Sequence, residues 1–131
     1  MKLLLDTHIW LWSVGDQKRL SRRVAKALAS PANELWVSPI STWEILGLCR
    51  KGRIKLKPDP EAWIGAAHAS LPFQEAPLTH EVALETERVV MPHHDPADRF
   101  LAATAKVYGL TLVTADENLL NGTGYLVLPN R

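Results

Sequence analysis

Acidic side chains stand at the junctions between predicted strands and helices, where a parallel α/β sheet binds its ligands. Asp6 ends a short apolar run at the N-terminus, and Asp116 follows the segment "TLVT" by two residues. Glu44 and Asp98 each lie on the apolar stripe of a predicted helix, close to its N-terminus. A carboxylate on such a stripe is costly to bury without a compensating charge. The pattern predicts that these four acids meet at one edge of a sheet.

Clustered carboxylates raise one another's pKa values unless a bound cation neutralises them. Oxygen ligands without cysteine or paired histidine favour Mg²⁺ or Mn²⁺ over Zn²⁺. Mg²⁺ keeps several waters in its coordination shell and is often completed by substrate phosphate oxygens. In such a site the metal polarises the phosphoryl group and activates a water molecule. The four acids therefore predict a metal site suited to phosphodiester hydrolysis.

Each acid could instead serve only as a helix cap or a paired surface charge, because aspartate is a favoured N-cap residue. In "DPADRFLAATA", Asp95 precedes a proline and is predicted to cap the helix. Asp98 heads a stripe of apolar residues three, four and seven positions further on. We therefore expect Asp98 to be the ligand and Asp95 to be the cap that positions it, with a direct metal contact by Asp95 left open.

Further polar side chains adjoin the acids. Three of them could orient a metal-bound water, or could simply cap a helix or end a strand: Thr7, Thr114 and Asn118. The segment "CRKGRIKLK" is locally basic and could attract nucleic-acid phosphates, or could form a solvated loop. The candidate phosphate contacts are Arg50, Lys51, Arg53, Lys55 and Arg99. Some of the five tryptophans could line a groove that takes a partner helix or stacks bases, rather than pack in the core.

The segments that must position these residues alternate between strands and helices. Apolar runs predict strands at 2–6, 34–38, 110–114 and 125–128, and a weaker edge strand at 73–78. Periodicity and capping residues predict helices at 21–30, 38–52, 59–71, 79–89 and 95–109, with a turn or two at 115–120. The alternation predicts an α/β fold with three layers and a central, mostly parallel sheet.

The composition limits the class of protein. A chain of 131 residues fits one domain spanning residues 1–131. The net charge of +1 gives no overall attraction to nucleic acid, so an anionic partner must bind a local patch. The single cysteine, Cys49, fits a reducing cytoplasm. No apolar run approaches the roughly 20 residues that cross a membrane, so we expect a cytoplasmic protein without a membrane partner.

Four segments in this order, "LLLDTHIWLW", "SPISTWEI", "HHDPADRFLAATA" and "LTLVTADENL", resemble the PIN domain, and specifically the VapC-type toxin ribonucleases of type II toxin–antitoxin modules. The resemblance runs over essentially the whole chain. The residues that match the acidic metal site of the family are Asp6, Glu44, Asp98 and Asp116. The resemblance implies an endoribonuclease that depends on Mg²⁺ or Mn²⁺, acts on RNA, is commonly a homodimer, and is inhibited by a small cognate antitoxin.

Other classes stay open at this point. A PIN-like domain could bind RNA or an antitoxin without catalysis, or could cut another nucleic acid. The motif "HHD" suggests an HD-type phosphohydrolase, but that motif belongs in an all-helical fold. We expect His93 and His94 to be loop residues near the rim of the site. A phosphoaspartate enzyme would require a second aspartate at the position that His8 occupies.

Overall fold

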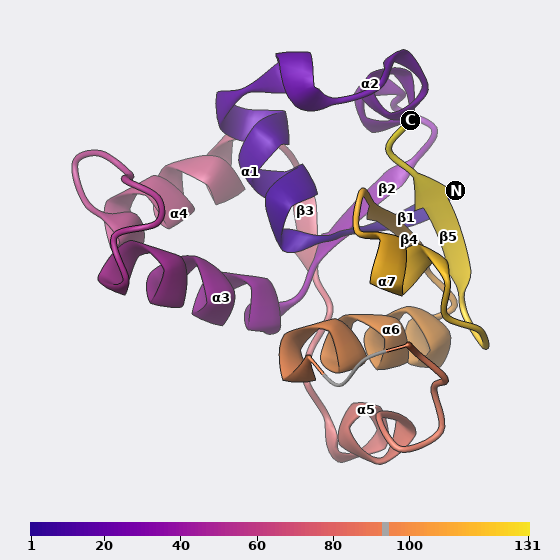
Figure 1. The fold of residues 1–131 in the computed structure, drawn as a ribbon. Coiled ribbons are helices and arrows are strands. Elements are labelled where there is room, and N and C mark those ends of the chain that lie inside the picture. The colour runs from indigo at the N-terminus through magenta and orange to yellow at the C-terminus, as the bar shows by residue number, and fades with distance from the viewer. Residues whose placement is uncertain (93–94) are drawn as a thin grey trace.

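The structure, a computed structural model, describes residues 1–92 and 95–131. Within these residues, five parallel strands form one sheet in the order β3-β2-β1-β4-β5, with helices on both faces (Figure 1). The strands are β1 (Lys2–Leu5), β2 (Glu34–Val37), β3 (Phe73–Glu75), β4 (Thr111–Thr114) and β5 (Leu126–Pro129). The predicted three-layer α/β/α fold is confirmed.

The central strand β1 is buried on both faces, as its unbroken apolar sequence predicts. Leu3 and Leu5 face one core, and Leu4 faces the other. The first core lies under α1 (Thr7–Gly15), α2 (Arg22–Ala29), α4 (Pro60–Ser70) and part of α3 (Pro39–Arg50), with a short 3-10 helix, η1 (Gln17–Arg19), beside α1. Trp10 is fully buried in this core and packs edge-on against Trp63.

The opposite face of the sheet is covered by α6 (Pro96–Tyr108) and α7 (Glu117–Leu120), and α5 (His80–Glu85) packs against α6 (Figure 1). Helix α3 contributes to both cores, because Ile40 packs in the second and Ile45 in the first. It therefore crosses the edge of the sheet directly after β2. That crossing puts Glu44, which lies between these two anchors, at the carboxyl edge of the sheet.

Most predicted elements occur within a few residues of their expected bounds, and their caps are those expected. Ser38 caps α3 ahead of a proline, and Gly109 ends α6 in the left-handed conformation (φ 64°). Helix α5 ends at Glu85 rather than at residue 89. Helix α1 was not predicted. Among the described residues, no helix is long and apolar enough to cross a membrane.

Candidate active site

Five carboxylates line one open cleft of about 560 Å³ at the carboxyl edge of the sheet. Asp6 follows β1 and Asp116 follows the neighbouring strand β4, so their positions are set by parallel pairing. Glu44 enters from the second turn of α3, and Asp98 from the first turn of α6, beside Asp95. The structure thus brings the four predicted acids together, with Asp95 as a fifth.

Asp6 is held rigidly in place. Its Oδ1 accepts the backbone N–H of Thr7 (2.7 Å), and its Oδ2 accepts the hydroxyl of Thr114 (2.7 Å). Only 7% of the residue is exposed. Burial raises the pKa of the Asp6 carboxyl above its usual value, although the two hydrogen bonds oppose that shift. Asp6 therefore caps α1 and also presents its carboxylate to the cleft.

Thr7 links the first helix to Glu44. The Thr7 hydroxyl donates to Oε1 of Glu44 (2.5 Å) and lies 3.0 Å from the hydroxyl of Ser41. Burial raises the pKa of Glu44, and the nearby charges of Asp6 and Asp95 raise it further. In this structure the Thr7 hydroxyl, a candidate for orienting a metal-bound water, orients the Glu44 carboxylate.

The two aspartates of "DPADRF" occupy different positions. Oδ1 of Asp95 accepts the backbone N–H groups of Ala97 (3.0 Å) and Asp98 (3.2 Å), so Asp95 caps α6 as predicted. Asp98 is only 7% exposed. Burial raises the pKa of Asp98 to about 8, and the charges of Asp95 and of the other acids in the cleft add to the shift. Both carboxylates line the cleft, and Asp98 is the more buried of the two.

The end of β4 has a hydrogen-bond arrangement similar to that at the end of β1. The Thr114 hydroxyl, which donates to Asp6, also accepts the backbone N–H of Asp116 (3.0 Å). Asp116 in turn accepts the backbone N–H of Asn118 (2.8 Å) and caps α7. Asn118 is half-buried and is not among the residues that line the cleft. The predicted histidines at 93 and 94 lie outside the described residues.

The donor set fits a hard divalent cation. Within residues 1–92 and 95–131, no group of three or more Asp, Glu, His or Cys side chains is arranged so that it could hold a metal ion as it stands. The clustered groups are nevertheless carboxylates, which are the ligands that Mg²⁺ and Mn²⁺ prefer. Burial, with added repulsion from neighbouring acids, raises the pKa values of Glu44 and Asp98. A bound dication would relieve that repulsion.

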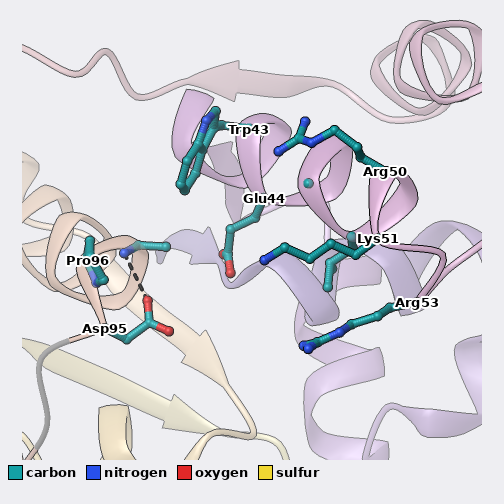
Figure 2. A pocket seen from close by; sticks show the side chains of 10 residues that line it. Trp43, Glu44, Arg50, Lys51, Arg53, Asp95 and Pro96 are labelled. Carbon is teal, nitrogen blue, oxygen red and sulfur yellow. Dashed lines mark hydrogen bonds between the residues drawn. The ribbon is translucent and has the colours of Figure 1, made fainter.

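The predicted cations divide into three groups. Arg50, Lys51 and Arg53 line a groove of about 310 Å³ together with Glu44 and Asp95 (Figure 2). Arg53 also lines the acidic cleft, and it borders a further cleft that includes Lys55. Arg99 lies elsewhere. Its Nη1 donates to the backbone carbonyls of Thr86 (2.6 Å) and Val89 (3.3 Å), so it ties α6 to the end of α5.

His8 and Arg19 also line the acidic cleft and were not predicted as site residues, and Trp12 lines it as one of the tryptophans that could form a groove. The His8 ring lies 5.9 Å from the Trp12 ring. The guanidinium of Arg19 lies 5.6 Å from the centre of the same Trp12 ring, in a cation–π contact. His8 and Trp12 are four residues apart on α1, so both lie on the side of the helix that lines the cleft. This spacing could have indicated that both residues belong to the site, but only if the segment had been predicted to be a helix.

A model of the PIN domain matches residues 3–123, and the chain belongs to the PIN domain family. Over 122 residues it is 34% identical to Ribonuclease VapC22 of Mycobacterium tuberculosis, covering 89% of this chain and 88% of that protein. The predicted VapC-type resemblance is thereby confirmed.

The fold also matches solved structures. VapBC2 from Rickettsia felis, bound to a DNA fragment from its promoter, has a TM-score of 0.74 at 14% identity, over 98% of both chains. VapBC-5 from Mycobacterium tuberculosis, a member of the VapBC family of toxin–antitoxin systems, has a TM-score of 0.62 at 16% identity, again over 98% of both chains. At these identities the likeness shows that the fold is shared.

Proposed function

We propose that this protein is a Mg²⁺- or Mn²⁺-dependent endoribonuclease that hydrolyses RNA phosphodiester bonds, and that it is the toxin of a type II toxin–antitoxin pair. The observation that carries the proposal is the cleft itself. Four carboxylates from four separate strand–helix junctions line it, in a chain that is 34% identical to a protein named a ribonuclease. A stable fold does not require such a concentration of acidic side chains in one cleft, whereas a cation site does.

In this proposal Asp6, Glu44, Asp98 and Asp116 hold the cation. When bound, it supplies Lewis-acid polarisation of the phosphodiester and activation of water. The protein's own contribution is to fix the acids before substrate binds. Thr7 connects Asp6 to Glu44, with its backbone N–H on the first and its hydroxyl on the second. Preorganised charge of this kind avoids a reorganisation cost during the reaction.

The remaining groups in this scheme position the acids or attract the substrate. Thr114 connects Asp6 to Asp116 through its hydroxyl, which bonds the carboxylate of the first and the backbone N–H of the second. Asp95 fixes the first turn of α6 and with it the backbone of Asp98. Arg53 stands at the junction of three clefts, where its charge can attract a substrate phosphate.

Two protein partners follow from the same proposal. The first is a cognate antitoxin, supported by the likeness to VapBC complexes. A groove beside the acidic cleft has apolar walls that suit an amphipathic helix, formed by Leu11, Trp12, Ile54, Leu56 and Trp63. The second partner is another copy of this chain, supported by an apolar patch between α3 and α6 that includes Pro39, Ile40, Leu78 and Phe100. We place this complex in the cytoplasm.

Cleavage of an end-labelled RNA tests the activity. We expect cleavage with Mn²⁺ or Mg²⁺, none with EDTA, and a loss of at least about 100-fold in Asp6→Asn. The matched control is Glu75→Gln, an exposed acid at the end of β3, which should cut like the wild type. RNA binding without cleavage under all metal conditions would favour a non-catalytic module. Equal cleavage of DNA of the same sequence would reassign the substrate.

A further inference from the structure

Trp43 is a large apolar side chain that the fold leaves 60% exposed. It lies on α3 immediately before Glu44, and its ring lines the groove of Figure 2. Gly47 and Arg50 follow at helical spacings of four and seven residues and line the same groove. Because Gly47 carries no side chain, the wall of the groove between the Trp43 ring and the Arg50 guanidinium is left open.

The groove combines this ring with positive charge. Figure 2 shows the ends of Glu44 and Lys51 pointing into one opening, across from Asp95, with the Trp43 ring on one side. Arg50 and Lys51 are exposed, so their charges are available to a ligand. An aromatic face beside two cations matches what single-stranded nucleic acid offers, since a strand alternates stackable bases with anionic phosphates.

The groove is also continuous with the acidic cleft. Glu44, Leu48, Arg53 and Asp95 line both. A strand whose phosphate lies at the carboxylates therefore has a direct path along α3 to Trp43. A base paired in a duplex has its faces covered by its neighbours, so a strand that uses this ring must be unpaired.

We propose that the groove is a nucleotide subsite, in which Trp43 stacks on an unpaired RNA base next to the scissile phosphate while Arg50 and Lys51 hold the adjoining phosphates. The position of this subsite beside the scissile phosphate rests on the proposed nuclease function. The subsite requires that the RNA segment it binds is single-stranded. The ring of Trp43 also borders the apolar patch with Ile40 and Phe100, so contact with a second copy of the chain is the competing role.

Binding of two labelled oligomers in EDTA separates these roles. One is a 12-nucleotide oligoadenylate, and the other is an abasic ribose-phosphate oligomer of the same length and charge. Wild-type protein should bind oligoadenylate at least about fivefold more tightly than the abasic oligomer, as expected from one stacked base. Trp43→Ala should lose that preference, and Trp43→Phe, which retains an aromatic ring, should keep most of it. Leu46→Ala, which removes an exposed apolar side chain outside this groove on the same helix, is the control.

The cations are tested in the same assay. Arg50→Gln with Lys51→Gln should weaken binding of both oligomers alike and should reduce the salt dependence of binding. An unchanged preference for bases in Trp43→Ala overturns the proposal. If that variant also loses self-association, measured by its molecular mass in solution, while the preference persists, Trp43 belongs to a protein interface. Because no cleavage is required, base-dependent binding by an inactive protein would refute the nuclease and keep the subsite.

Discussion

Replacing Asp98 by asparagine should make the metal-free protein more stable at neutral pH. The burial of Asp98 and the surrounding acids raise its pKa to about 8, whereas the unfolded chain should have a value near 3.8. The folded-state pKa is therefore the higher of the two. The stability that the neutral carboxyl contributes is present at acidic pH and is lost as the pH rises toward 8. Asparagine retains the shape and removes the ionisation.

The size of the effect follows from that shift. One pKa unit corresponds to about 1.4 kcal/mol, and pH 7 lies about three units above the ordinary pKa of an aspartate, so the upper value is about 4 kcal/mol. The cleft is open to water, which screens its charges, and we expect about half of this, ~2 kcal/mol. For a chain of this length, that free energy corresponds to a rise in melting temperature of about 6 °C.

Urea unfolding of wild type and Asp98→Asn in EDTA at pH 5, 6, 7 and 8 measures the difference. The stabilisation should grow with pH, from about 1 kcal/mol or less at pH 5 to its largest value near pH 8. Glu75→Gln, an exposed control, should show no such trend. A variant that is less stable than the wild type at pH 8, or a difference that does not change with pH, would refute the electrostatic reasoning about the cleft.

Two further predictions concern the acidic cleft, and a third concerns the end of α6. Mn²⁺ should raise the melting temperature of the wild type but not that of an Asp6/Asp98 double asparagine variant, and equal shifts in both would count against the site. Thr7→Val removes the hydroxyl that bonds Glu44, which should raise the pKa of Glu44 and move the pH–rate profile of RNA cleavage to higher pH; an unmoved profile contradicts this role. Gly109→Ala should lower the free energy of unfolding by about 1 kcal/mol in urea titrations, because the residue has a φ of 64°, and a neutral result would show that the turn relaxes.

The strand ends could be predicted because the apolar runs of β1 and β4 stop at hydrophilic residues, and parallel pairing then brings Asp6 and Asp116 together. Helix α1 could not be predicted in this way. Its segment is apolar at most positions, and its buried residues include both Trp10 and Ser13, so no amphipathic period stands out. His8, which lines the cleft from α1, is absent from the predicted site residues for that reason.

Two other differences have local causes. Arg99 is adjacent to Asp98 in sequence, but successive helical residues point about 100° apart, so its guanidinium reaches backbone carbonyls at the end of α5 instead of the cleft. From the sequence alone, a capping role and a cleft role are alternatives for each aspartate. In the structure Asp6 and Asp116 do both, because a side chain can accept a backbone N–H with one oxygen and still border the cleft.

That double role of the caps affects how this fold can change. Asparagine is as good an N-cap as aspartate, since it keeps one acceptor oxygen for the backbone N–H. A change from aspartate to asparagine at Asp6 or Asp116 therefore removes a charge from the cleft while the helix it begins keeps its first turn. Loss of the proposed chemistry and loss of the fold are separable at these positions. A single substitution at either position could therefore convert this protein into a folded binding protein that lacks the proposed nuclease activity.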